Sequence, residues 1–419
     1  MSADEAALRR VLAVVFRQSL AVLDPARLVA EALPARPPDG ARVRLFAAGK
    51  AAAAMARGAL SRWGDRIEAT LVVTVDGAPI DWTALDLRSP PVVLHAAHPV
   101  PDERSIAAAH AAIAHVHGLG PDDRLLVLIS GGSSALLVLP PPGLDLEDER
   151  RVVRALLEGG APIHDVNLVR RHLTRIKGGR LALAAAPALV QTLALSDVVG
   201  GAVHDIGSGP TVADPTTAAE ARLVLARHAP AELAARLAPH LDDTPRPFPV
   251  RTEARLLAGP EDLARAAATG LSAHGFSVRI EPPEGGDAHA VVEKRLAQAA
   301  ALAPGSAIVV ACEPTLALPP RRGRGGRAGW VALAAMKRLP PGVALLCGAS
   351  DGTDGSSAAA GAVTSLRAAG ELDAGRIDAA LAGYDDAAIH EAIGTAIITG
   401  PTGQNLTDLH ILARVFSES

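Results

Sequence analysis

The sequence predicts an α/β protein of two domains, each built on a largely parallel sheet that is covered by helices. Three observations lead to this prediction. The chain has 419 residues, more than one ordinary core organises, and 49% of them are apolar. Short apolar runs alternate with alanine-rich helical stretches, as in parallel sheets connected by helices. A proline-rich and charged segment, "APHLDDTPRPFPVRTEARL", interrupts that alternation, and we place the domain boundary there, giving domains 1–247 and 248–419.

The expected strands are short, continuous and rich in Val, Leu and Ile, and most end at Gly, Asp or His. In the first domain they cover 43–49, 69–77, 91–99, 125–132 and 189–197; in the second they cover 276–280, 306–314 and 342–352. Helices are expected between them, for example at 50–63, 103–117 and 218–226.

Composition excludes several classes of function. A net charge of −4 leaves no electrostatic footprint for nucleic acid or an anionic membrane. The longest nearly apolar run, 181–195, is interrupted by Pro187 and is too short to cross a bilayer. The two cysteines have no metal-binding spacing and suggest a reducing compartment. We therefore expect a cytoplasmic monomer or homodimer with a small-molecule substrate and no nucleic-acid or membrane partner.

Polar residues follow the expected strands at their carboxyl ends, where open parallel sheets bind their ligands. The residues at these ends are Gly49-Lys50, Asp76-Gly77, His98, Ser130 to Ser134, Ser196-Asp197, Glu313 and Ser350 to Asp354. Glycine, serine, lysine and carboxylate together suit a phosphate group and a divalent metal.

The clearest corner is "LLVLISGGSSALL", where Ser130, Gly131, Gly132, Ser133 and Ser134 join a strand to a helix. Backbone N–H groups and hydroxyls at such a corner can bind a phosphate or a carboxylate. Residues 131–135 also approximate the G-x-S-x-G nucleophile elbow. A hydrolase would need an Asp and a His at later strand ends, and His390 and His410 both lie in helix-like sequence. A plain turn with a serine cap is the third possibility.

Lysine occurs only four times, and two of the four lie in glycine-containing motifs. Lys50 follows a strand in "AAGKAAAAM", where its ammonium could reach a phosphoryl group. Lys177 belongs to "VNLVRRHLTRIKGGRLA", a basic segment that either binds an anion or forms a solvated helix face.

Three further motifs carry charge. Asp197 directly follows a strand and could bind Mg²⁺, act as a base, or cap a helix. The loop "RRGRGGRAGW" contains Arg324 and Arg327 among glycines, a composition suited to phosphate contacts. Asp351 and Asp354 in "SDGTDG" could share a cation or form two Asp-Gly turns. The G-x-G-x-x-G, H-E-x-x-H and C-x-x-C motifs are absent, which disfavours a standard dinucleotide fold and zinc hydrolysis.

Taken in order, the motifs resemble those of the class II glycerate 2-kinases, whose C-terminal part is the MOFRL domain. The segments that carry the resemblance are "AAGKAA", "HPVPDERS", "ISGGSSALL", "NLVRRHLTRIKGGRLA", "SDV", "IGSGPT", "GRGGR", "SDGTDG" and "ITGPTGQNLTDL". The resemblance implies a Rossmann-like N-terminal domain, a C-terminal MOFRL domain and an active site in the cleft between them. It also implies ATP, Mg²⁺ and phosphorylation of the 2-hydroxyl of D-glycerate.

By the same resemblance, Lys50 and Arg327 stabilise the phosphoryl group, and Asp197 is the metal or base carboxylate. Residues 130–134 hold phosphate or the glycerate carboxylate; Lys177, Arg324, Asp351 and Asp354 are further cofactor-binding candidates, with Asp351 a second metal ligand. The family usually continues the arginine loop with Asn-Gln-Glu, where this chain has Ala328-Gly329-Trp330. Two alternatives therefore stay open: a kinase for another small hydroxy acid or sugar acid, and a non-catalytic nucleotide- or metabolite-binding relative.

Overall fold

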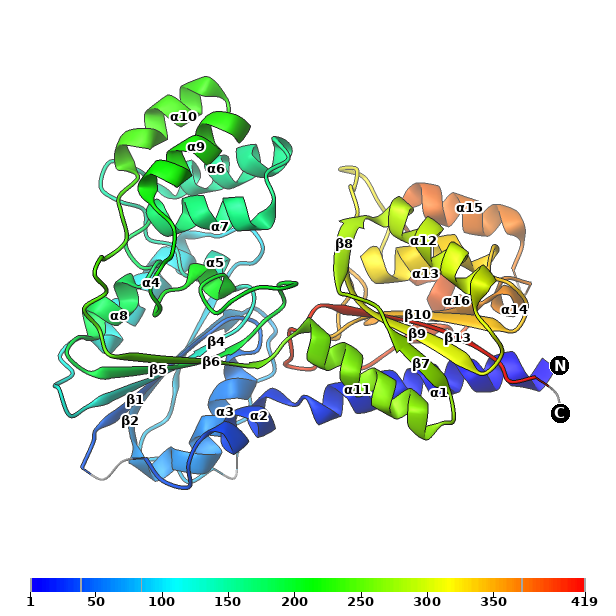
Figure 1. Cartoon of the computed structure of the whole chain (residues 1–419), viewed down its shortest axis with the longest axis horizontal. Coiled ribbons are helices and arrows are strands. Elements are labelled where there is room, and N and C mark those ends of the chain that lie inside the picture. Colours follow the sequence, from blue (N-terminus) through cyan, green and yellow to red (C-terminus); the bar gives the residue numbers. More distant parts are fainter. Residues whose placement is uncertain (1, 38–39, 84, 371, 418–419) are drawn as a thin grey trace. The chain divides into compact units, whose positions relative to one another are not determined.

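The computed structural model describes residues 2–37, 40–83, 85–370 and 372–417. The chain divides into two compact units, one made of residues 25–257 and the other of residues 1–24 and 258–419 (Figure 1). The prediction of a two-domain α/β fold is confirmed. Among the described residues, none of the helices has both the length and the apolar character needed to cross a bilayer.

The first unit contains a sheet with strand order β3-β2-β1-β4-β5-β6, the order of Rossmann-type sheets. Neighbours from β3 to β5 pair in parallel, as predicted. The strands are β1 (Val43–Ala48), β2 (Ile67–Val75), β3 (Val92–Ala96), β4 (Arg124–Ile129), β5 (Leu189–Leu195) and β6 (Thr252–Ala258). The helices are α2 (Pro25–Ala32), α3 (Ala52–Trp63), α4 (Glu103–Val116), α5 (Ser133–Leu136), α6 (Leu146–Glu158), α7 (Ile163–His172), α8 (Arg180–Ala185), α9 (Ala218–His228) and α10 (Ala231–Leu237).

Two cores hold this unit together. Strands β1, β2, β4 and β5 bury apolar side chains against α4 and α8, with Phe46 and Val127 fully buried. A second cluster joins α6, α7, α9 and α10, which form a small helical layer of their own (Figure 1). The register sets Ala48 of β1 beside Val73 of β2 and Ile129 of β4, and Ile129 beside Ala194 of β5. The carboxyl ends of these strands therefore lie level along one edge.

The second unit is built on the order β12-β11-β10-β13-β9-β7, with β8 also paired to β9. Its strands are β7 (Ser277–Ile280), β8 (Glu284–Asp287), β9 (Ser306–Thr315), β10 (Val343–Ala349), β11 (Gly361–Ser365), β12 (Ala396–Ile397) and β13 (Asp408–Arg414). Its helices are α1 (Ser2–Val22), α11 (Pro260–Ala273), α12 (Ala288–Ala301), α13 (Arg327–Met336), α14 (Leu366–Ala369), α15 (Ala374–Gly383) and α16 (Asp386–Ala392).

The expectation of a largely parallel sheet is wrong for this unit. Strand β13 lies between β9 and β10 and is antiparallel to both, and β11 is antiparallel to both of its neighbours, β10 and β12. The error has one main source: we interpreted the segment around His410 as helix-like, whereas it forms strand β13. A short apolar run bounded by polar residues fits either element, so its pattern alone does not decide between them.

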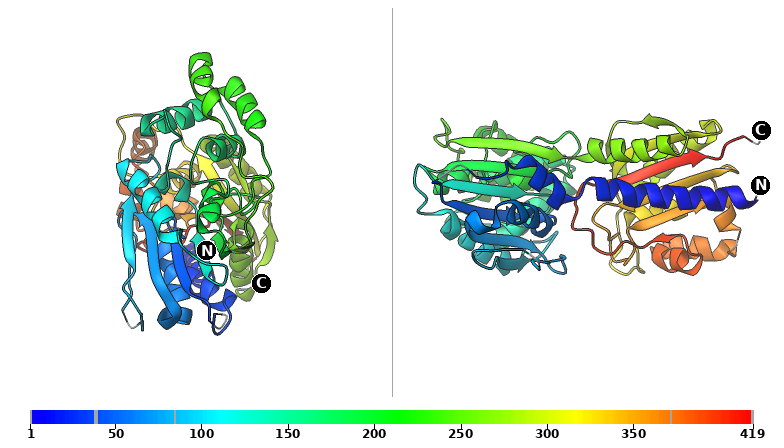
Figure 2. Two further views of the ribbon diagram at one scale, coloured as in Figure 1. Left: turned by 90° about the vertical axis from the view of Figure 1, so that its left-hand side faces the viewer. Right: turned by 90° about the horizontal axis from the view of Figure 1, so that it is seen from below.

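Helix α1 packs in the second unit, although the division at 247–248 assigned it to the first domain. It runs beside α11 and the strands of the second sheet (Figure 2, right). Phe16 is fully buried, and a Cβ on Gly348 of β10 would lie 2.8 Å from its ring. Glu5 Oε1 accepts a hydrogen bond from the N–H of Gly342 at 2.8 Å. The sequence shows an amphipathic helix but does not show which apolar surface it covers.

Candidate active site

The corner after β4 is built as the glycines and serines predict, but its helix is short. Gly132 has φ +86°, a conformation that side chains disfavour, and α5 then covers only Ser133–Leu136. Ser133 Oγ donates to the carbonyl of Ser130 at 2.9 Å. Among the described residues, the N–H groups of Gly131 and Gly132 make no hydrogen bond within the protein. With so short a helix, an anion would be held by these N–H groups more than by a helix dipole.

Lys50 lies directly beside this corner. Gly49 precedes it with φ +128°, and a Cβ there would lie 2.2 Å from Ser130 Oγ, so only glycine allows the two strand ends to approach. The N–H of Lys50 donates to the carbonyl of Gly131 at 3.0 Å. A Cβ on Gly132 would lie 3.2 Å from both Lys50 Cγ and His98 Cδ2. The ends of β1, β3 and β4 thus bring a lysine and a histidine to the glycine–serine corner.

Asp197 lies at the same edge, just beyond β5. Because Ile129 pairs with Ala194, residues 196 and 197 follow β5 at the level where 130–132 follow β4. Ser196 Oγ donates to the carbonyl of Val198 at 3.1 Å and accepts from its N–H, which fixes the turn that carries the carboxylate. The role of this carboxylate as a base or a metal ligand stays a prediction.

A second layer of polar residues supports the corner, and the sequence prediction did not single it out. Ser208 Oγ lies 3.0 Å from Ser134 Oγ and donates to Asn167 Oδ1 at 3.3 Å. A Cβ on Gly207 would lie 2.3 Å from Ser133 Oγ, so this glycine also permits a close approach. The signal was present, since "IGSGPT" and "NLVRRHL" contain these residues. Among the described residues no histidine or carboxylate hydrogen-bonds Ser133 or Ser134, which removes the basis for a nucleophile elbow.

The basic segment around α7 is buried, so its interpretation as a solvated helix face is wrong. Arg171, 3% exposed, contacts Asp214 at 3.0 Å and Asp205 at 3.3 Å. Burial opposes ionisation of Asp214, but hydrogen bonds from His172 and Thr216 outweigh it and bring its pKa to about 2. These ion pairs tie α7 to the segment that carries Ser208.

Lys177 is also buried, at 1% exposure, and its Nζ lies 3.3 Å from Glu149 Oε1. Burial lowers the pKa of Lys177, and the charge of Glu149 partly restores it. Its ammonium therefore has a carboxylate partner inside the protein, and a contact with the cofactor stays a prediction.

In the second unit, Arg327 begins α13 and is held by two carboxylates. Its Nε and Nη2 donate to the two oxygens of Asp408 at 2.7 and 3.1 Å, and its Nη1 donates to Glu313 at 3.0 Å. Asp408 is 1% exposed; burial raises its pKa, and the charge of Arg327 acts against that rise. Arg324 instead makes an exposed, two-pronged pair with Glu391.

Asp354 caps the same helix. Its two oxygens accept the N–H groups of Ala328 and Gly329 at 3.1 and 2.7 Å, and burial raises its pKa to about 8. Asp351 accepts the N–H of Thr353 at 3.2 Å, as in the Asp-Gly turn that the sequence left open. Among the described residues, no three His, Cys, Asp or Glu side chains gather closely enough to hold a metal ion. Mg²⁺ commonly takes only one or two carboxylates plus substrate phosphates, so single carboxylates such as Asp197 and Asp351 still suit it.

The glycines of the arginine loop accommodate a second buried carboxylate, Asp386. A Cβ on Gly325 or Gly329 would lie 1.9 or 2.2 Å from an oxygen of Asp386. Burial raises the pKa of Asp386 to about 7. His390, on α16 as predicted, places its Nε2 3.0 Å from the carbonyl of Gly329. The small residues after Arg327 thus fit tightly against an acidic partner that this chain supplies from α16.

The first unit contains a Rossmann-type sheet, and Lys50, the serines of 130–134 and two glycine N–H groups lie at its carboxyl edge. In the second unit Arg327, paired with two carboxylates, begins α13. Together the two units define a two-domain α/β protein. The chain belongs to the class II glycerate kinase family: residues 11–242 match the family described as "Domain of unknown function (DUF4147)" and residues 306–408 match the MOFRL family.

Individual relatives cover nearly the whole chain. A protein of Agrobacterium vitis named "Putative hydroxypyruvate reductase" is 38% identical, over 98% of this chain and 96% of its own. The D-glycerate 2-kinase of Thermotoga maritima is 34% identical, over 97% of this chain and 99% of its own. The crystal structure of a glycerate kinase from Thermotoga maritima matches 98% of this chain and all of its own, with a TM-score of 0.82 and 32% identity.

Proposed function

We propose that this protein is an ATP-dependent kinase that phosphorylates the 2-hydroxyl of D-glycerate. The observation that carries the proposal is Lys50 beside the corner 130–132, at the carboxyl edge of the first sheet. A lysine side chain that starts beside two glycine N–H groups is suited to binding a phosphoryl group or a carboxylate there. The Thermotoga maritima relative named D-glycerate 2-kinase supports this substrate.

In this reaction the 2-hydroxyl oxygen of glycerate attacks the γ-phosphorus of ATP, and the bond from that phosphorus to the β–γ bridging oxygen breaks. The hydroxyl proton passes to a base, for which Asp197 is the candidate. Lys50 and Arg327 stabilise the charge on the transferred group, so catalysis is mainly positioning and charge neutralisation. Mg²⁺, when bound with the nucleotide, would neutralise phosphate oxygens; Asp351 is a carboxylate proposed to hold it, and Asp197 would be a second ligand if it is not the base.

A coupled assay of ADP release with D-glycerate, ATP and Mg²⁺ tests the proposal. We expect turnover that falls at least a hundredfold in Lys50→Ala, the order of loss seen when one charge-stabilising group is removed. Lys337→Ala is the matched control, because Lys337 pairs with the exposed Asp378 in the other unit. Equal loss in both variants, or full activity of Lys50→Ala, would remove the proposed role of Lys50.

The same assay with a panel of small hydroxy acids and sugar acids as acceptors tests whether D-glycerate is preferred. A reductase is the second candidate, because the name of the Agrobacterium vitis relative favours it. Oxidation of NADH in the presence of hydroxypyruvate, without ATP, would support that reading. We expect none, since the first strand ends in Gly49-Lys50 and no G-x-G-x-x-G follows a strand.

A further inference from the structure

A histidine, His98, lies beside Lys50 at the corner 130–132. A Cβ on Gly132 would lie 3.2 Å from His98 Cδ2, 3.5 Å from His98 Nε2 and 3.2 Å from Lys50 Cγ. The Cδ2–Nε2 edge of the imidazole therefore faces Gly132, and the stem of the lysine lies against the same residue. His98 is exposed and Lys50 is half-buried, so both side chains are accessible from solvent.

Arg104 anchors the chain that follows His98. Its Nη1 and Nη2 donate to the two oxygens of Asp76, just beyond β2, at 2.9 and 3.0 Å. Its Nε donates to Asp102 Oδ2 at 2.8 Å, and Asp102 accepts the N–H of Arg104 as the N-cap of α4. An arginine that engages both oxygens of a carboxylate fixes the geometry of the pair. The start of α4 is therefore joined to the same sheet edge that carries the corner.

Helix α6 holds the same segment from another side. Arg150 Nε donates to the carbonyl of Pro101 at 2.9 Å. Pro99 and Pro101 each have a φ angle fixed by the proline ring, so the backbone after His98 has few conformations available. His98 thus projects from a stiff segment. Binding groups that are ordered in advance lose less entropy when a ligand binds.

The imidazole adds a kind of contact that the lysine does not provide. It is a planar group whose Nε2, when protonated, donates one directed hydrogen bond, whereas an ammonium is a compact charge on a flexible stem. Hydrogen bonds to a charged oxygen are shorter and roughly twice as strong as those between neutral groups. An oxyanion at the corner would accept hydrogen bonds from His98 and from the N–H groups of Gly131 and Gly132, with Lys50 beside it.

We propose that His98 is a ligand-binding residue that donates a hydrogen bond from Nε2 to an oxyanion held at the corner 130–132. The oxyanion is either the carboxylate of a hydroxy acid or a phosphate group of a nucleotide. The proposal rests on the proposed function in naming these two sources as D-glycerate and ATP. The two sources differ in their consequences, because a contact with one ligand changes the binding of that ligand and not of the other.

Replacement of His98 by leucine and by glutamine tests the proposal. Leucine removes the hydrogen-bond donor, and glutamine keeps an N–H donor at the end of its side chain. In His98→Leu we expect one KM, for D-glycerate or for ATP, to rise about tenfold or more, while the other KM and the melting temperature stay at the wild-type values. A rise for D-glycerate identifies the carboxylate, and a rise for ATP identifies the phosphate. His98→Gln should restore most of the lost affinity.

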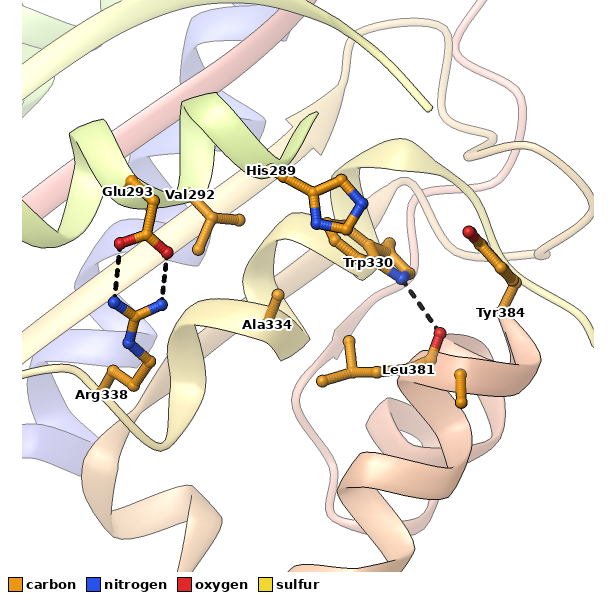
Figure 3. Close-up of a pocket in the computed structure, with 9 residues that line it drawn as sticks. His289, Val292, Glu293, Trp330, Ala334, Arg338, Leu381 and Tyr384 are labelled. Atoms are coloured by element: carbon orange, nitrogen blue, oxygen red, sulfur yellow. Dashed lines mark hydrogen bonds and ion pairs between the residues drawn. The ribbon is translucent and has the colours of Figure 1, made fainter. Parts of the chain in front are cut away.

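His289→Leu is the matched control. His289 belongs to the second unit, where its ring lies edge-on to Trp330 with centroids 4.6 Å apart, in the pocket between α12 and α13 (Figure 3). It is an exposed histidine like His98, but it lies away from the corner in sequence and in unit. Its replacement should leave both KM values unchanged.

Calorimetric titration of the full chain with D-glycerate and with ADP separates this proposal from the kinase activity, because binding needs no turnover. An active kinase whose two KM values are unchanged in His98→Leu, or rise by the same factor, refutes the role of His98 alone. Weaker binding of one ligand to His98→Leu, in a protein that phosphorylates no acceptor, supports the role of His98 and refutes the kinase. A wild-type protein that binds neither ligand refutes both.

Discussion

Replacing Arg327 by alanine is expected to destabilise the protein as well as inactivate it. The substitution removes a two-pronged donor from Asp408, whose side chain is only 2% exposed, and leaves that carboxylate buried without its main partner. Breaking a buried ion pair in this way costs about 3–5 kcal/mol. The Arg327 side chain is itself 34% exposed, so solvent screens part of the interaction, and we expect a loss of about 2–3 kcal/mol.

The assay is urea unfolding followed by circular dichroism, with thermal unfolding as a second measurement. A loss of this size lowers the melting temperature by roughly 5–10 °C in a domain of this size. Burial already raises the pKa of Asp408, and loss of Arg327 raises it further. A carboxyl whose folded pKa is raised stabilises the fold at low pH and loses that contribution as pH rises through the folded pKa. The variant should therefore lose less stability, relative to the wild type, at pH 5 than at pH 8.

The double variant Arg327→Ala/Asp408→Asn separates structure from catalysis. Asparagine removes the unpaired charge at position 408, which should restore most of the stability. It should restore none of the turnover, because the Arg327 guanidinium is still missing. A single variant as stable as the wild type, or a loss of stability that is the same at pH 5 and pH 8, would refute the reasoning about Asp408.

Three further predictions address other parts of the account. Gly132→Ala should lose about 1–2 kcal/mol of stability, because the backbone of residue 132 has φ +86°. Its kcat/KM should fall more than tenfold, because the new methyl group would displace Lys50 and His98. A kcat/KM equal to that of the wild type would contradict this prediction. Asp386→Asn should lose less stability than the wild type as pH rises from about 4 to 7, because burial raises the pKa of Asp386 to about 7 and asparagine does not ionise. Melting temperatures measured across that range check this, and melting temperatures that change with pH equally in both proteins would count against it. Lys177→Met should cost about 2 kcal/mol, less than a fully broken buried pair, because Glu149 then keeps only Arg170, at 3.7 Å, as a cationic partner. An unchanged urea midpoint would show that the pair is not structural.

The sequence predicted the first unit well because parallel strands are continuous apolar runs that end in recognisable corners. Gly49-Lys50 and residues 130–134 were placed at strand ends correctly, and the register brings them together. The supporting residues Asn167 and Ser208 were missed, since their hydrogen bonds join segments 41 residues apart. No periodicity records such a contact.

The second unit was harder to predict for two physical reasons. Its central strand β13 is short and largely apolar, a pattern that a buried helix shares, so the sequence did not predict a strand there or its antiparallel pairing. Its charged residues also make bonds within the protein: Asp354 accepts N–H groups of α13, and Arg327 is paired with Asp408. Their roles toward a nucleotide or a metal stay predictions, because residue type alone does not distinguish a structural carboxylate from a ligand.

Product analysis tests the central claim most directly. The wild-type protein would be incubated with ATP, Mg²⁺ and a mixed pool of small hydroxy acids and sugar acids, with Lys50→Ala in parallel, and the products identified by mass spectrometry and phosphorus NMR. The account predicts 2-phosphoglycerate as the main product, together with an equal amount of ADP, and at least a hundredfold less of both from the variant. Phosphorylation of a different acid, or ATP binding without any phosphorylated product, would contradict it.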